Sequence, residues 1–419
     1  MAQQGSQGRP ILRDTLPPVL ISAGILLAGN GLLTTLVALR GRAEGFSESW
    51  IGAIGAAYFL GFMLASFVTA ILIRRAGHIR VFAALSALAA ISTLFMLLVR
   101  DPLAWSGARF ILGFAFSGIT TVIESWLNQM ADNRDRGRVL SLYRVVDLGF
   151  VTAGQFLLPV FGPAGHEIFV IVAIIYCLGL VPVSLSALSS PPPPSVVGPR
   201  LGQIWMISPV ACFGCLSIGL TNGAFRTIGP VYAQQVGLDV DQVVWFMSLG
   251  IVAGAILQYP LGWLSDRTDR RLVLLLATAA AAGSSIWLSG LDGSRPLFVF
   301  AGAALFGGFA LPLYSLSTAH ANDRCPDGMH VTMAVTLLLI YAVGAAAGSQ
   351  ISAAIVDAWG APWFFTYTCV VHGVFLVFVA IRTRQRSGVP AEKRSGFVAL
   401  LRTSPAIFRL GRDRTNHHD

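Results

Sequence analysis

Charged residues are scarce in this sequence. They make up 12% of its 419 residues, whereas a soluble domain carries about 25% charged residues. Hydrophobic residues make up 55% of the chain, and the mean hydropathy is +0.70. So few charges cannot form the hydrated surface of a soluble protein of this length. The composition therefore excludes a soluble globular protein and indicates that lipid surrounds most of the chain.

Motifs for nucleotide-driven or catalytic chemistry are also missing. The sequence contains no P-loop, which argues against direct use of ATP. Of the seven histidines, only His320 and His372 fall near hydrophobic runs, too few for most intramembrane catalysis. Cys212 and Cys215 form a C-x-x-C pair inside such a run, without a histidine or carboxylate beside it, and are interpreted as packing residues. We therefore expect no enzyme activity, no metal and no cofactor.

Long apolar runs dominate the sequence instead. A helix needs about 20 apolar residues to cross the hydrocarbon core of a bilayer, and the runs lack the alternating polarity of barrel strands. We predict an all-α polytopic membrane protein, with twelve transmembrane helices in two pseudo-symmetric six-helix bundles. The predicted spans are Pro17–Leu39, Trp50–Ile73, Val81–Val99, Leu103–Met130, Val139–Phe161, Ile168–Leu188, Trp205–Ala233, Val243–Leu264, Leu272–Leu291, Leu297–Thr318, Val331–Val356 and Trp363–Ile381.

The positive charges lie mainly on one side of these spans. With the amino terminus inside, 22 of the 29 lysines and arginines fall in cytoplasmic segments, four fall outside and three fall within spans. This distribution predicts an inner-membrane protein with both termini in the cytoplasm. The basic stretch Gly396–Leu410 is interpreted as lying on the anionic inner leaflet, or as a disordered tail. Nucleic acid is not expected as a partner.

An internal repeat relates the two halves of the chain. A constant offset of 192 residues places Asn30 on Asn222 and Thr35 on Thr227. The predicted domains are an amino-terminal bundle 1–188, a cytoplasmic linker 189–204, a carboxy-terminal bundle 205–381 and a tail 382–419. Parallel six-helix repeats are typical of transporters that rock one bundle against the other around a central site. We expect a monomer.

The segment between the eighth and ninth spans carries a recognisable pattern. It reads Gly262-Trp-Leu264-Ser-Asp266-Arg267-Thr-Asp269-Arg270-Arg271. This pattern resembles the inter-helix signature of the major facilitator superfamily, except that Asp269 replaces the second glycine. The resemblance implies a twelve-helix transporter in which Gly262 allows close helix packing. It also implies that Asp266 caps a neighbouring helix and that the arginines face anionic lipid.

The corresponding segment of the first half departs from the family pattern. It reads Ala70-Ile-Leu72-Ile-Arg74-Arg75-Ala-Gly77-His-Ile-Arg80, so that Ala70 and Arg74 stand where the family has glycine and aspartate. We therefore expect an asymmetric inner gate, to which Arg75, Arg144 and the second-half motif contribute. Arg109 and the residues after it are similar to the family's second motif. The stretch 124–138 resembles a bacterial subgroup of the superfamily. The antiporter signature expected in the fifth span is absent.

Five charged residues lie inside the predicted spans: Arg109, Glu124, Arg144, Asp147 and Arg226. A charge there costs on the order of 2.5–3.5 kcal/mol, so each needs a reason. We expect Glu124 and Asp147 at one depth, with Arg144 one turn below Asp147. The cluster either carries the driving proton or forms permanent ion pairs that lock the inner gate. In the first interpretation Glu124 is the carrier, because the fourth span should face the cavity, while Asp147 holds Arg144.

Four polar residues are the predicted contacts with the solute: Asn30, Arg109, Asn222 and Arg226. Helices one, four, seven and ten line the cavity in the family that the chain resembles. The arginines suit an anionic group, but an arginine near a helix end can also extend to the interface. The asparagines can bind a solute or join neighbouring helices. Weaker candidates are Gln155, Gln258, Tyr314, Gln350 and His372.

These features favour secondary active transport of a small solute by alternating access, coupled to protons. Export of amphipathic compounds and uptake of a polar metabolite are both open. A membrane-embedded enzyme or sensor is the alternative from another class. Its catalytic groups are too few, and the 38-residue tail is small for an output domain.

Overall fold

The computed structural model describes residues 8–130, 136–186, 191–192, 198–385 and 396–397. These residues form helices and no strand, which confirms the predicted fold class. The first half contains α1 (Gly8–Ala43), α2 (Glu48–Ala76), α3 (His78–Leu98), α4 (Pro102–Met130), α5 (Arg136–Gln155), α6 (Leu157–Phe161) and α7 (Glu167–Ser184). The second half contains α8 (Leu201–Ile207), α9 (Pro209–Gln235), α10 (Val240–Arg267), α11 (Arg270–Ser289), α12 (Pro296–Ala310), α13 (Leu313–Asn322), α14 (His330–Trp359) and α15 (Pro362–Gln385).

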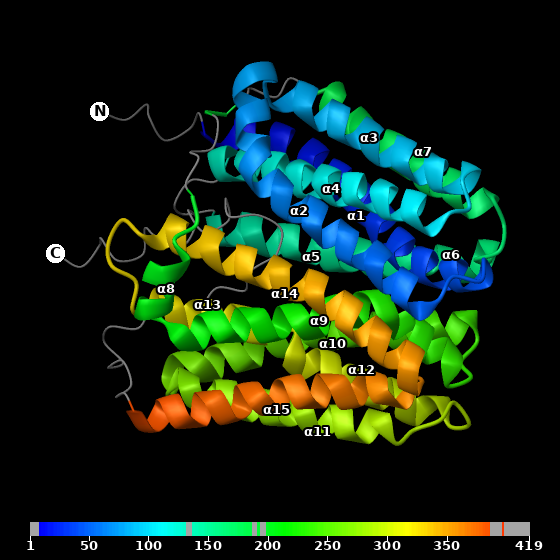
Figure 1. The fold of residues 1–419 in the computed structure, drawn as a ribbon. Helices are drawn as coiled ribbons and strands as arrows, with labels where there is room; N and C mark the ends of the chain where they lie inside the picture. Colours follow the sequence, from blue (N-terminus) through cyan, green and yellow to red (C-terminus); the bar gives the residue numbers. More distant parts are fainter. Residues whose placement is uncertain (1–7, 131–135, 187–190, 193–197, 386–395, 398–419) are drawn as a thin grey trace.

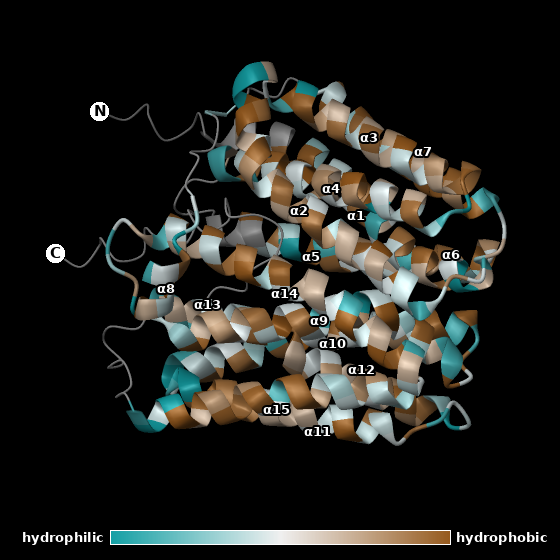
Figure 2. Ribbon diagram, viewed as in Figure 1, coloured by the Kyte–Doolittle hydropathy of each residue, from teal (hydrophilic) through white to brown (hydrophobic). Residues whose placement is uncertain are grey.

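The two halves lie side by side, with their long helices roughly parallel (Figure 1). We call the end with the α2–α3 and α10–α11 connections the arginine-rich face. The end with the α1–α2 and α9–α10 connections is called the opposite face. Hydrophobic residues cover the lengths of most helices, and hydrophilic residues gather toward the two ends (Figure 2). This banding is expected of a bundle whose middle is surrounded by lipid.

The number of spans agrees with the prediction. Eleven described segments are long and apolar enough to cross a membrane, and α8 with α9 supplies a twelfth when this bent pair is counted as one span. α9 is also among the most buried helices, and small or polar residues occupy much of its length. Such a helix packs against other helices over most of its surface.

Several span boundaries differ from the prediction. The predicted seventh span begins at Trp205, but α8 and α9 meet at an angle of 114°, and the long helix begins at Pro209. Ser208 accepts a hydrogen bond from the N–H of Ala211, and a proline at the first position also favours a helix start. The tenth span is divided between α12 and α13, and the fifth between α5 and α6. Apolar run length does not reveal such breaks.

Two glycines of α2 allow the halves to approach closely near the opposite face. A Cβ atom added to Gly52 would lie 2.3 Å from the Cβ of Ala353 on α14. One added to Gly55 would lie 2.3 Å from the Cγ2 of Thr227 on α9. Both distances are far below van der Waals contact, so larger residues would force the helices apart. Small residues at such crossings let helix backbones pack tightly.

Polar contacts join the halves at the same end. The Gln235 side chain donates a 2.6 Å hydrogen bond to Glu48, which begins α2. The Ser49 hydroxyl donates a 2.6 Å hydrogen bond to Asp357 near the end of α14. The structure is therefore closed between the halves at the opposite face.

Candidate functional site

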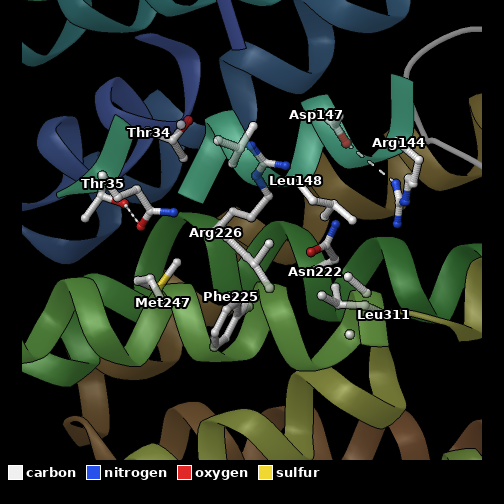
Figure 3. Close-up of a pocket in the computed structure, with 16 residues that line it drawn as sticks. Thr34, Thr35, Arg144, Asp147, Leu148, Asn222, Phe225, Arg226, Met247 and Leu311 are labelled. Carbon is white, nitrogen blue, oxygen red and sulfur yellow. Dashed lines mark hydrogen bonds and ion pairs between the residues drawn. The ribbon is translucent and has the colours of Figure 1, made fainter. Parts of the chain in front are cut away.

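Two adjoining cavities lie between the halves. They measure about 90 and about 100 Å³, and both are lined by Arg144, Asp147, Val151 and Arg226. Further polar residues of their walls are Asn30, Thr34, Thr35, Tyr58, Thr120, Gln155, Asn222 and Tyr341. The walls come mainly from α1, α2, α4 and α5 in the first half and from α9, α10 and α14 in the second. We call these two spaces the central cavities; Figure 3 shows one of them.

Arg226 extends from α9 across the space between the halves toward α5 (Figure 3). Its side chain is half-buried and lines both central cavities. It makes no hydrogen bond or ion pair with any residue in the described part of the chain. Its guanidinium is therefore available to a molecule in the cavities.

Arg144 connects the two halves. Its guanidinium lies 3.6 Å from the Asp147 carboxylate one turn along α5. It also donates a 2.8 Å hydrogen bond to Gln258 of α10, which in turn donates to the Ser315 hydroxyl at 2.7 Å. A change in the charge of Asp147 would thus alter a contact between the halves.

Arg109 occupies a different position from the one predicted for a solute contact. It is 4% exposed and lines neither central cavity. Its guanidinium lies over the Tyr58 ring, 4.6 Å from the ring centre, and Tyr58 separates it from the cavity. Its Nε and Nη1 atoms have no hydrogen-bond partner among the described residues. Arg109 and Arg226 are close enough for their charges to repel.

The repeat-related asparagines both line the central cavities but bind different helices. Asn30 accepts a 3.4 Å hydrogen bond from Tyr58 of α2, whereas Asn222 donates one to Tyr341 of α14. Tyr58 and Tyr341 were missed by the sequence reasoning. No motif or charge marks a tyrosine within an apolar run, so the sequence contains no signal that would have singled them out.

The acidic residues differ from the expectation in their access to the cavities. Asp147 lines both central cavities, whereas Glu124 is 1% exposed and lines neither. α5 begins at Arg136, three residues before the predicted start, so Asp147 lies deeper in its helix than expected. Both acids interact electrostatically with the buried Tyr143. Glu124 is therefore not part of the walls of these two cavities, whereas Asp147 is, and which acid carries a proton stays a prediction.

The loop motif of the second half forms a network of ion pairs. Buried Arg270 pairs with Asp323 at 2.7 Å and with Asp266 at 3.1 Å. Buried Arg271 pairs with Asp269 at 2.6 Å. Asp269 also caps α11 by accepting a hydrogen bond from the Arg271 N–H. Asp269, which replaces the second glycine of the family pattern, is therefore the residue that caps α11.

Three expectations for this motif need correction. Arg270 and Arg271 are buried in ion pairs and do not face lipid; Arg267 is exposed and stacks on Trp263 at 3.9 Å. Within the described part of the chain, Asp266 caps no helix and instead accepts hydrogen bonds of 3.0 and 3.1 Å from the Phe397 N–H. The Phe397 ring covers Gly262, whose added Cβ would lie 2.2 Å from that ring.

Among the described residues, the first-half loop forms no such network. Arg74, Arg75 and Arg80 are exposed and make no hydrogen bond or ion pair with the residues that the structure describes. The segments 131–135, 187–190 and 193–197, and all of the predicted tail surface except Gly396 and Phe397, lie outside the described residues.

Twelve spans in two related halves around a charged central cavity define a solute transporter of the membrane, and not an enzyme. The chain belongs to the Major Facilitator Superfamily, whose family profile matches residues 19–207 and 211–413.

Two bacterial relatives match over nearly their whole length. An uncharacterized MFS-type transporter of Yersinia enterocolitica, YE1530, is 26% identical over 391 residues, covering 92% of this chain and 98% of the relative. The uncharacterized MFS-type transporter YcaD of Escherichia fergusonii is 25% identical over 377 residues, covering 89% and 97%.

Solved transporter structures share the fold. The nucleoside transporter NupG superposes with a TM-score of 0.74 at 15% identity, covering 86% of this chain and 98% of that structure. An inward-facing, occupied bacterial homologue of the human lysosomal transporter Spinster gives a TM-score of 0.73 at 13% identity, covering 90% and 97%.

Proposed function

We propose that this protein is a secondary active transporter that moves a small solute by alternating access and is driven by protons. The observation that carries the proposal is a charged cavity between two halves that meet closely at the opposite face. Small and polar residues make that contact, so the halves can separate without exposing a large apolar core. Rocking of the halves then opens the cavities to one side of the membrane at a time.

In this proposal, Asn30, Asn222 and Arg226 contact the solute directly, because they line the central cavities. Arg109 acts from behind Tyr58, through its charge and through the position of the Tyr58 ring. The repeat-related asparagines also hold α2 and α14 by their hydrogen bonds to tyrosines. Solute binding therefore acts on helices of both halves.

Asp147 carries the coupling proton in this proposal, and Glu124 adjusts its electrostatic environment. Asp147 borders the cavities and holds Arg144, whose other partner is Gln258 of the second half. A proton on Asp147 removes the negative charge that attracts Arg144. The contact between the halves then differs between the two protonation states, which is the condition for coupling. In the competing interpretation, the Arg144–Asp147 pair is permanent and only locks the gate.

We assign the arginine-rich face to the cytoplasmic side of an inner membrane. Exposed Arg74, Arg75, Arg80 and Arg267 lie at that face, where the positive-inside rule places basic residues. These side chains are suited to contact with anionic lipid headgroups. The transporter acts as a monomer with both termini cytoplasmic, and the linker 189–204 joins the bundles on that side.

The test is transport by the purified protein in proteoliposomes. A defined mixture of small metabolites of all charge classes is supplied with and without an imposed pH gradient, and accumulated solutes are identified by mass spectrometry. Asp147→Asn should abolish gradient-driven accumulation while downhill exchange continues, because the amide mimics the protonated acid. Glu124→Gln should retain a reduced response to the gradient.

Asp241→Asn is the matched control, since Asp241 is exposed at the opposite face and lines neither central cavity. It should transport like the natural protein. If Asp147→Asn concentrates solute as strongly as the control does, the proton is carried elsewhere. If the natural protein accumulates none of the solutes under any gradient, proton-driven transport is wrong.

A further inference from the structure

The central cavities carry an unbalanced positive charge. The charged residues of their walls are Arg144, Asp147 and Arg226. Arg144 is balanced by Asp147 and held by Gln258. Arg226 has no hydrogen bond or ion pair within the described ranges of the chain. The charge of Arg226 is therefore the positive charge of the cavity walls that the described residues leave unbalanced, and it is available to a molecule that enters the cavities.

The chemistry of Arg226 selects an oxyanion. A guanidinium at membrane depth is costly to leave unpaired because the surroundings have a low dielectric constant. Its planar arrangement of N–H donors matches the two oxygens of a carboxylate, sulfonate or phosphonate. The side chain points from α9 toward α5, so these donors face the space between the halves (Figure 3).

Arg109 strengthens this preference without entering the cavity. Its guanidinium lies over the Tyr58 ring, which lines the cavity, and its positive charge interacts with that of Arg226. Two neighbouring guanidiniums raise the electrostatic potential between them, which attracts an anion and repels a cation.

The apolar part of the walls favours an organic body over an inorganic ion. Phe59, Phe62 and Phe116 lie on the side of the first half, and Phe225 and Met247 lie on the side of the second. Aromatic and thioether side chains bind carbon skeletons through buried apolar area and ring contacts. A phosphate or sulfate ion would make no use of these surfaces.

We propose that the solute is a small organic monoanion with an apolar or aromatic body, whose acidic group binds Arg226. This inference rests on the transport function proposed above and narrows its substrate class. A single negative charge matches the single unbalanced guanidinium of the cavity walls. The Asn30, Asn222 and Tyr341 side chains supply further polar contacts around the anion.

The experiment compares probes of one shape and different charge on the purified full-length protein. Benzoate, benzamide and benzylamine form one series, and phenylacetate, phenylacetamide and phenethylamine form a second; binding is measured by thermal shift and equilibrium dialysis. The monoanions should bind about tenfold or more tightly than the neutral and cationic probes, which is the usual size of a charge-assisted contact. Phthalate, a dianion, should bind more weakly than benzoate.

Variants identify the residue responsible. Arg226→Gln should remove the preference for the monoanions, and Arg226→Lys should keep part of it because the charge remains without the planar fork. Arg295→Gln is the matched control, since Arg295 is an exposed arginine directly before α12 and lines neither central cavity. It should leave the preference unchanged. Melting temperatures without probe show whether each variant folds.

The comparison of anionic, neutral and cationic probes on the natural protein needs no variant. It therefore tests the monoanion inference even if Arg226→Gln does not fold. Equal binding of benzoate and benzamide, or tighter binding of the amines, overturns the monoanion inference. So does a preference that Arg226→Gln leaves intact. Gradient-driven accumulation of neutral or cationic solutes in the proteoliposome assay would then leave the transporter proposal standing. Absence of accumulation of any solute would count against that proposal instead.

Discussion

The two halves share a repeat and a fold but differ in where they place charge. Of the five charged residues predicted within spans, four belong to the first half, and Arg226 belongs to the second. The repeat offset pairs Arg226 with Thr34, and both line the same cavity. A duplicated backbone can therefore keep its architecture while its halves take different tasks. The first half holds the ionisable cluster, and the second presents Arg226, which has no hydrogen bond or ion pair among the described residues.

The connections at the arginine-rich face show a second contrast. Arg270 and Arg271 of the second half are buried and paired, whereas Arg74 and Arg75 of the first half are exposed and unpaired among the described residues. The α10–α11 connection is thus fixed by charge, whereas the arginines of the α2–α3 connection make no such pairs among the described residues. From this difference we predict an asymmetric inner gate.

The largest effect should come from breaking the buried ion pair of the second half. Arg270→Ala removes the guanidinium that lies 2.7 Å from the Asp323 carboxylate, whose side chain is 3% exposed. Such a change costs about 3–5 kcal/mol. The free energy of unfolding in denaturing detergent measures it. Arg75→Ala, in the exposed connection of the first half, should stay within about 0.5 kcal/mol; equal losses would remove the contrast between the halves.

The next largest effect should come from Gly52 and Gly55, the α2 glycines against which the second half packs. Gly55→Val should disfavour closure at the opposite face by about 1–3 kcal/mol, since the side chain overlaps Thr227. Spin labels at Ala43 and Trp359, at the ends of α1 and α14, should then report a longer distance between the halves. Gly107→Ala is the control, because an added Cβ there meets no atom within 4 Å. An unchanged distance in Gly55→Val would show that the halves do not close through this contact.

A smaller effect should come from the hydrogen bond that joins Arg144 of the first half to Gln258 of the second. Gln258→Leu removes the acceptor that Arg144 uses in the second half, whereas Gln155→Leu removes an acceptor that Thr35 uses within the first. A hydrogen bond of this kind contributes about 0.5–1.5 kcal/mol. Spin labels at Arg75 and Leu272 should therefore show a larger open population at the arginine-rich face for Gln258→Leu. Equal populations in the two variants would show that Arg144 does not hold the halves together.

The smallest effect should come from Asp266, whose side chain is 39% exposed. Asp266→Asn weakens its pair with Arg270 and its contact with the Phe397 N–H, which should lower the free energy of unfolding by about 1 kcal/mol. Hydrogen exchange at the Phe397 amide should become faster. Arg74→Gln, the equivalent position of the first half, should change stability by less than about 0.5 kcal/mol. A greater effect of Arg74→Gln would reverse the asymmetry.

The sequence by itself determined the fold class, because lipid offers no hydrogen-bond partners to a backbone. Each long apolar run therefore had to be a helix, and the repeat, the loop motif and the arginine distribution supplied the two-half architecture. Polar residues inside apolar runs also predicted which side chains line the cavity. Asn30, Asn222 and Arg226 line it, although their contact with a solute is still a prediction.

Only the tertiary structure decided which charged residues face the cavity. Arg109 and Arg226 are equally polar in an apolar sequence, yet one lies behind Tyr58 and the other in the open space. The two acids differ in the same way, since Asp147 lines the cavities whereas Glu124 is buried and lines neither. Because an α-helix turns by about 100° per residue, a shift of one residue moves a side chain to another face. Packing against neighbouring helices decides which face of a helix points toward the cavity. A span that is apolar on all sides gives no sequence pattern from which that face could be predicted.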